Sequence, residues 1–165
     1  MRAAMTGSWR PIDILLAGTG AGVAVCAFLP WAQISAGFLS VTKTGYDGDG
    51  QFTLILGLLV ILAVVVFVYG KLAEWAMLLA ALICGGFIAG IGMIDWIDLE
   101  SRRSDLGDAA SIVDVSVGIG LVLTVVGGFV IAIASGLRLY PHFEHWRDNR
   151  SKQRGHGPDD EPPLG

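Results

Sequence analysis

Four long apolar runs divide the chain, and polar segments separate them. The runs cover residues 12–31, 52–69, 72–94 and 115–139. Each is close to the roughly 20 residues that an α-helix needs to cross the hydrocarbon core of a bilayer. Charged residues inside the runs stand near their ends. The pattern predicts an all-α membrane protein whose single domain, residues 1–140, is a bundle of four transmembrane helices.

The polar segment between the first two runs, residues 32–51, predicts a short β-hairpin in the first outer loop. Ala36 and Gly37 form the two-residue turn in this prediction, because glycine tolerates the positive φ that such turns use. Ile34 then faces Leu39, and the hairpin divides into an apolar and a polar face. An irregular loop is the alternative for this segment.

Capping residues indicate where two of the helices begin. Pro11 and Asp13 suit the first turn of the first helix, where proline needs no N–H and a carboxylate suits the helix dipole. We interpret Asp13 as a cap rather than as a functional acid within the membrane. Ser111 and Asp114 fit a capping box, which predicts that the fourth helix begins before its apolar run.

Basic residues predict the orientation of the bundle in the membrane. Eight of the eleven Lys and Arg residues lie on one side, in the two terminal segments, in the turn between the second and third runs, and at Arg138 near the end of the fourth run. The two other loops, 32–51 and 95–114, hold the remaining three. Because basic residues concentrate on the cytoplasmic side, we expect a plasma-membrane protein with both termini in the cytoplasm. Residues 141–165 are then a cytoplasmic tail, first lying at the membrane interface and then disordered.

Composition agrees with a membrane protein. Of the 165 residues, 53% are hydrophobic and only 16% are charged, whereas a soluble domain carries more charge. Both cysteines lie inside apolar runs, so the outer loops have no disulfide framework. The lipid bilayer is the expected surrounding, and no nucleic-acid partner is expected.

Small residues at four-residue spacing predict where the helices pack. Without a hydrophobic drive between helices in lipid, close backbone approach holds them together. The predicted packing residues are Gly18, Gly22, Gly86, Gly90, Gly120, Thr124, Gly128 and Gly136. The fourth run has the longest series, so we expect it to form the central packing seam. The second run is nearly all large aliphatic, and we expect it to expose the most surface to lipid.

Candidate chemistry is sparse. No run carries a charged residue near its midpoint, which counts against a pump or transporter, and no nucleophile–base pair or phosphate loop is present. His142 and His145 stand three residues apart but lack a third metal ligand, so an interfacial polar role is favoured. Residues 47–50 resemble part of a calcium loop, but a glycine-rich turn accounts for them better. No catalytic residue, metal site or cofactor is predicted.

The outer loops are acidic. They hold eight carboxylates against three basic residues, a local charge of −5, which predicts a basic or cation-bridged partner. The candidate partner surface comprises Trp31, Phe38, Asp47, Asp49, Asp98, Glu100, Asp105 and Asp108.

Three short motifs carry a resemblance to a known family. They are Phe-Leu-Pro-Trp at 28–31, Gly-Tyr-Asp-Gly-Asp-Gly at 45–50 and Val-Ser-Val-Gly-Ile-Gly-Leu at 115–121. Together with Gly37-x-x-Ser40 they resemble small four-span membrane proteins common in actinobacteria. That resemblance implies a plasma-membrane location and no established activity. The overall plan is also similar to claudin-like proteins, although the loop cysteines and the Gly-Leu-Trp signature of those proteins are missing.

These observations predict a non-enzymatic accessory or assembly protein. We expect it to bind a membrane-protein partner, or another copy of itself, through its outer loops or a helix face. A component of a transporter or channel is one alternative, and a lipid- or cofactor-binding subunit of a larger membrane complex is the other.

Overall fold

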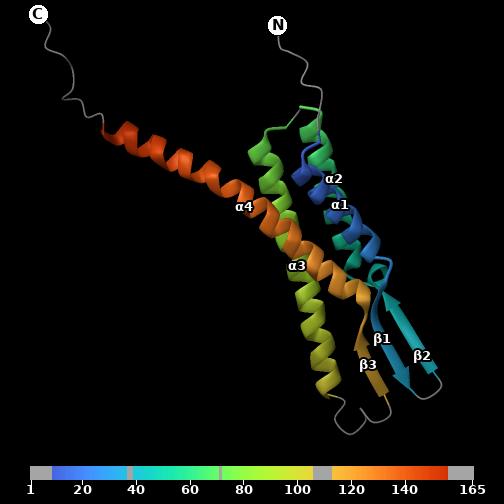
Figure 1. Ribbon diagram of the computed structural model, residues 1–165. Coiled ribbons are helices and arrows are strands. Elements are labelled where there is room, and N and C mark those ends of the chain that lie inside the picture. The colour runs from blue at the N-terminus through green and yellow to red at the C-terminus, as the bar shows by residue number, and fades with distance from the viewer. Residues whose placement is uncertain (1–8, 37–38, 71, 106–112, 156–165) are drawn as a thin grey trace, which may run out of the picture.

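The fold consists of long helices lying side by side, with a small sheet at one end (Figure 1). The computed structural model describes residues 9–36, 39–70, 72–105 and 113–155. In chain order the elements are α1 (Pro11–Cys26), β1 (Pro30–Ala36), β2 (Leu39–Thr44), the 3₁₀ turn η1 (Gly45–Asp47), α2 (Gly50–Val68), α3 (Glu74–Asp105), β3 (Val113–Val117) and α4 (Ile119–Gly155). We call the end that holds the strands the sheet end.

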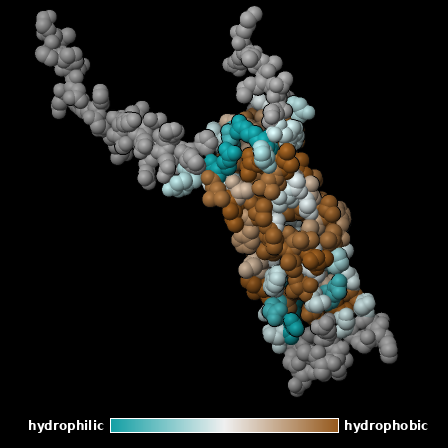
Figure 2. Space-filling view, in the orientation of Figure 1, coloured by the Kyte–Doolittle hydropathy of each residue, from teal (hydrophilic) through white to brown (hydrophobic). Residues whose placement is uncertain are grey.

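Three of the four helices in the described residues are long and apolar enough to cross a membrane. They are α2, the stretch of α3 up to Ser104, and α4 up to Tyr140. Figure 2 shows hydrophobic residues over the middle of the molecule and hydrophilic ones towards both ends. By length and composition this is a membrane protein.

The first helix is shorter than its apolar run. The run predicted at 12–31 is helical only to Cys26, because the chain turns at Ala27–Leu29 and enters β1 at Pro30. Sixteen residues make a helix of about 24 Å, against a hydrocarbon core of about 30 Å. The apolar residues that follow α1 therefore belong to the connection and the sheet.

The third helix is longer than predicted. Residues 95–105, assigned to an outer loop, continue α3 to Asp105. A helix of 32 residues is about 48 Å long, which exceeds the hydrocarbon core by several turns. Because the apolar run ends at Ile94, the eleven residues after it extend beyond the apolar band.

The fourth helix begins later and ends later than predicted. Residues 113–117 form β3, so Asp114 does not cap a helix; Ser111 lies outside the described residues. Alternating valines suit a strand with one apolar face, and the helix starts only at Ile119. At its other end α4 continues through Pro141 to Gly155, so the first part of the predicted interfacial tail extends the same helix away from the bundle (Figure 1).

The sheet is antiparallel, with β1 in the centre and the order β2-β1-β3. Ile34 pairs with Val41 on one side and with Val115 on the other. The predicted pairing of Ile34 with Leu39 is therefore wrong by two residues, since Ala36 belongs to β1 and pairs with Leu39. A shift of two leaves every side chain on its predicted face, because side chains alternate with a period of two.

The bundle core is aliphatic and lies between all four helices. Its fully buried members are Leu16, Val23, Val60, Val64, Met77, Leu78, Ala81, Ile88 and Ile131. The segment of α2 buries 22% of its residues, against 39% for α3 and 44% for α4. As expected, α2 exposes the most apolar surface among these three, although Val60 and Val64 place one of its faces in the core.

Two pairs of glycines bring helices into backbone contact. A Cβ on Gly57 of α2 would stand 2.7 Å from the carbonyl oxygen of Gly20 on α1. A Cβ on Gly128 of α4 would stand 2.6 Å from the amide nitrogen of Ala89, and one on Gly85 would stand 2.9 Å from the carbonyl oxygen of Gly128. These approaches permit no side chain, so they define the α1–α2 and α3–α4 interfaces.

The predicted packing residues fall into two groups. On α4, Gly120, Thr124 and Gly128 are buried, and Gly136 is half-buried beside Leu82. Four others are exposed, with no atom within 4 Å of an added Cβ: Gly18, Gly22, Gly86 and Gly90. The backbone contacts between helices are made at Gly20 and Gly85 instead. Where a helix is apolar all round, spacing alone does not show which series of small residues faces a neighbour.

Candidate functional site at the sheet end

Trp31 joins the sheet to the helices. It is 6% exposed, and its indole nitrogen donates a hydrogen bond of 2.9 Å to the carbonyl of Cys26, at the end of α1. Gly45 and Gly120 contact its ring so closely that a Cβ on either would overlap it. Trp31 was predicted to belong to the partner surface; it lines a cleft between the sheet and α3, described below, although most of its ring is buried. The indole buries its apolar body while its N–H adds a second hydrogen bond to a carbonyl that also accepts from the Leu29 amide.

Gly118 fixes the start of α4 against β1. Its amide donates a hydrogen bond of 2.8 Å to the carbonyl of Trp31. A Cβ at this position would overlap the carbonyl of Pro30, so the backbones of the two segments meet directly. The position of the sheet relative to the bundle is thus set from α1 and from α4.

Residues 44–50 form a capped turn. One carboxylate oxygen of Asp47 accepts hydrogen bonds from the Thr44 hydroxyl (2.7 Å) and the Thr44 amide (3.1 Å). These bonds hold the pKa of Asp47 below its usual range. Asp49 then stands at the N-cap position of α2. No three His, Cys, Asp or Glu side chains are grouped for a metal ion in the described part of the chain.

An open cleft of about 590 Å³ lies between the sheet and α3. The apolar face of the sheet contributes Ala32, Ile34 and Val115, and α3 contributes Leu99. The charged residues that line the same cleft are Lys43, Asp47, Asp49, Asp95, Asp98 and Arg102. We call this the sheet cleft. It combines apolar strand residues with four carboxylates and two basic groups.

The charges of the sheet cleft are only partly paired. Asp98 accepts a hydrogen bond of 2.8 Å from Arg102, one turn further along α3, and both side chains are exposed. Asp95 is half-buried and lies one residue beyond the apolar run of α3, outside the apolar band. Burial, followed by the nearby carboxylates of Asp49 and Asp98, raises the pKa of Asp95 to about 6. The excess of negative charge favours a cationic ligand.

The predicted partner residues are not all brought together. Asp47, Asp49 and Asp98 line the sheet cleft, whereas Glu100 lines a separate groove and lies 3.9 Å from Arg103. Phe38 and Asp108 lie outside the described residues, as do the side chains of Asp105, His142 and His145.

The sequence did not indicate that α3 contributes side chains to the sheet cleft. Asp95, Asp98, Leu99 and Arg102 recur at helical spacing and therefore share one face of α3. The spacing was visible in the sequence, but it carries meaning only once residues 95–105 are recognised as a helix.

The opposite end of the bundle holds a capped and ion-paired corner. Asp13 accepts a hydrogen bond of 3.0 Å from the amide of Arg10, which confirms its capping role, and its second oxygen is buried without a partner among the described residues. Arg10 forms a 2.9 Å ion pair with Glu74, and this raises the pKa of Arg10. The corner ties the start of α1 to the start of α3.

Comparison with models of known protein families gives no match, and no curated protein matches the chain either.

Proposed function

We propose that the chain is a four-span protein of the plasma membrane, with both termini in the cytoplasm and the sheet end outside. In Figure 1 the start of α1 and the end of α4 lie away from the sheet, which agrees with an even number of crossings. The basic residues of the terminal segments and of the α2–α3 turn favour the cytoplasm for that side. The resemblance to four-span actinobacterial proteins supports the same arrangement.

We further propose that the protein is a non-enzymatic accessory or assembly protein, whose sheet cleft binds the exposed part of a membrane partner. The observation that carries this proposal is the composition of the cleft. Ile34, Val115 and Leu99 offer apolar contacts, while Asp49 and Asp95 carry negative charge that is not ion-paired at hydrogen-bond distance. A partner segment with both basic and apolar side chains complements this surface.

The position of the cleft supports a binding role. Its walls are the strands, α3 and the capped turn at residues 44–50, and Trp31 and Gly118 attach the sheet to the bundle. A preformed surface of this kind loses little conformational entropy when a partner binds. The alternative of a transporter or channel component receives no comparable support, because no charged side chain lies near the middle of an apolar helix in the described residues.

Photo-crosslinking in intact membranes tests the proposal. A photoreactive phenylalanine derivative replaces Ile34, which lines the cleft and is 37% exposed, or Leu62, which is exposed on the apolar surface of α2. We expect a protein adduct from position 34 and none from position 62. The adduct at position 34 should decrease in the variant Asp49→Asn/Asp95→Asn, and should decrease as added salt shortens the Debye length.

Absence of an adduct at position 34 would contradict the proposal, and so would an adduct that is insensitive to both carboxylates and to salt. An adduct between two copies of the chain would identify the partner as a homo-oligomer. Stable expression of the double variant, checked by its melting temperature, separates loss of binding from loss of folding.

A further inference from the structure

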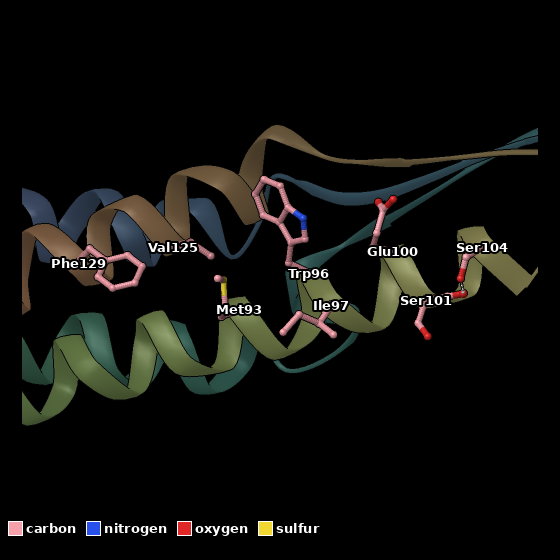
Figure 3. A pocket seen from close by; sticks show the side chains of 8 residues that line it. All are labelled: Met93, Trp96, Ile97, Glu100, Ser101, Ser104, Val125 and Phe129. Carbon is pink, nitrogen blue, oxygen red and sulfur yellow. Dashed lines mark hydrogen bonds between the residues drawn. The ribbon is translucent and has the colours of Figure 1, made fainter.

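A second concave surface lies between α3 and α4, on the apolar side of the bundle. This groove of about 720 Å³ has an apolar half formed by Met93, Ile97, Val125 and Phe129. Its polar half is formed by Glu100, Ser101 and Ser104 (Figure 3). We call it the α3–α4 groove.

The groove exists because α3 extends further towards the sheet end than the neighbouring helix α4 does. At Gly92 the two helices still touch, since a Cβ there would stand 2.7 Å from a methyl carbon of Val125. Beyond that level α3 continues for more than three turns, whereas α4 begins only at Ile119 and is preceded by β3. Because α4 runs antiparallel to α3 and has only six residues before Val125, the last turns of α3 extend past its start, and no described helix packs along this face there.

The groove passes from apolar to polar along its length. Met93 and Phe129 are about half exposed and belong to the apolar band, whereas Glu100 lies two turns of α3 beyond Met93. Trp96 stands between the two halves, and its indole nitrogen faces the side of Glu100 (Figure 3). Tryptophan with this arrangement is typical of the boundary between hydrocarbon and head groups.

The polar half of the groove holds oxygen atoms that can accept further hydrogen bonds. The Glu100 carboxylate is 3.9 Å from the nearest guanidinium nitrogen of Arg103, which is longer than a hydrogen bond. The Ser104 hydroxyl donates its proton to the backbone carbonyl of Ser101 (2.7 Å), so its oxygen remains an acceptor. Acceptors grouped around a carboxylate complement an ammonium group.

We propose that the α3–α4 groove binds a zwitterionic phospholipid with a primary-amine head group, of the phosphatidylethanolamine class, taken from the leaflet at the sheet end. An acyl chain lies along Met93, Val125 and Phe129. The ammonium donates to the carboxylate of Glu100 and to the Ser104 hydroxyl. Anionic head groups are disfavoured, because the carboxylate of Glu100 lines the polar half of the groove. The site is separate from the sheet cleft and does not depend on the partner proposed for it.

Native mass spectrometry of the full chain, purified in a mild detergent, tests this inference. The protein is mixed with equal amounts of phosphatidylethanolamine, phosphatidylcholine and phosphatidylglycerol, and the retained lipids are counted. We expect about tenfold preference for phosphatidylethanolamine over phosphatidylglycerol, which corresponds to roughly one charge-assisted hydrogen bond. Phosphatidylcholine should bind more weakly than phosphatidylethanolamine, because its quaternary ammonium has no N–H to donate.

Two variants locate the bound lipid. Glu100→Gln should reduce the preference to about twofold or less, and Ser101→Phe should decrease retention of all three lipids by filling the groove. The matched control is Asp98→Asn, which removes an equal charge from the same helix but lines the sheet cleft. All three side chains are exposed, so these variants should fold.

Equal retention of the three lipids would overturn the inference. So would a preference for phosphatidylethanolamine that Glu100→Gln leaves intact, or one that Asp98→Asn removes to the same extent. A lipid-free dimer that Ser101→Phe dissociates would also overturn it, because a second copy of the chain would then occupy the groove.

Discussion

Replacing two adjacent glycines of α3 with alanine isolates the packing at the α3–α4 interface. Gly85 and Gly86 lie in the same helix, so the gain in helix propensity, about 0.5–1 kcal/mol in water, is common to both variants. Only the surroundings differ. A Cβ on Gly85 would stand 2.8 Å from the amide nitrogen of Ala132, whereas nothing lies within 4 Å of one on Gly86.

The magnitude follows from the backbone atoms that the new methyl group meets. The 2.8 Å separation is 0.6 Å short of the 3.4 Å at which ordinary van der Waals contact begins. Backbone atoms of Ala132 and Gly128 lie in that direction, so no side-chain rotation relieves the overlap and the helices must separate. We expect Gly85→Ala to be less stable than Gly86→Ala by about 1–3 kcal/mol, as is usual for overpacking.

Thermal unfolding in a mild detergent measures this difference. For a chain of this size, 1 kcal/mol corresponds to about 2–4 °C, so Gly85→Ala should melt about 2–12 °C below Gly86→Ala. Adding Gly128→Ala, which inserts a second methyl group into the same contact, should cost less than it does alone, because the helices are already apart. If Gly85→Ala melts at or above Gly86→Ala, the two backbones do not meet at this point and the packing described above is wrong.

Three further predictions concern the sheet end and the orientation of the bundle. Trp31→Phe removes the indole hydrogen bond to the Cys26 carbonyl, which keeps its bond from the Leu29 amide, and should lower stability by about 0.5–1.5 kcal/mol, measured by thermal unfolding; an unchanged melting temperature would contradict the bond. Because the pKa of Asp95 is raised from 3.8 to about 6, its contribution to stability is lost as pH rises through that range. Asp95→Asn should therefore raise the melting temperature at pH 7.5 and leave it nearly unchanged at pH 4, and an equal effect at both values would refute this. After replacement of the native cysteines, Ser40→Cys should react with a membrane-impermeant thiol reagent in intact cells and Tyr69→Cys should not, whereas the reverse labelling would overturn the proposed orientation.

The helices and the faces of the hairpin were predictable because hydropathy and alternation are periodic signals. Long apolar runs identify α2 and α3, and alternation assigns Ile34 and Val41 to one face. The same periodicity explains the error in register. A shift of two residues preserves both faces, and both pairings leave a connection of two residues, so neither signal distinguishes them.

The third strand and the sheet cleft were missed because their signals were assigned to other elements. Val113, Val115 and Val117 alternate as a strand does, but Val115 and Val117 were counted with the apolar run 115–139 and Val113 with the loop before it. The burial of Trp31 was missed as well, since the sequence does not reveal the contacts that its ring makes with Gly45 and Gly120. Both errors concern contacts between segments distant in sequence, which local patterns do not encode.

The central place of β1 has a consequence for the biogenesis of the chain. Its edge opposite β2 is covered by β3, and Val113 pairs with Ala36, 77 positions earlier in the sequence. At a synthesis rate of about 5–20 residues per second, roughly 4–15 s pass between the synthesis of β1 and the synthesis of β3. During this interval its unpaired edge is a template for any other extended chain. A chain whose synthesis stops before β3 therefore keeps a hairpin with an open edge that can pair with other copies, so removal of such truncated chains matters for production of this protein.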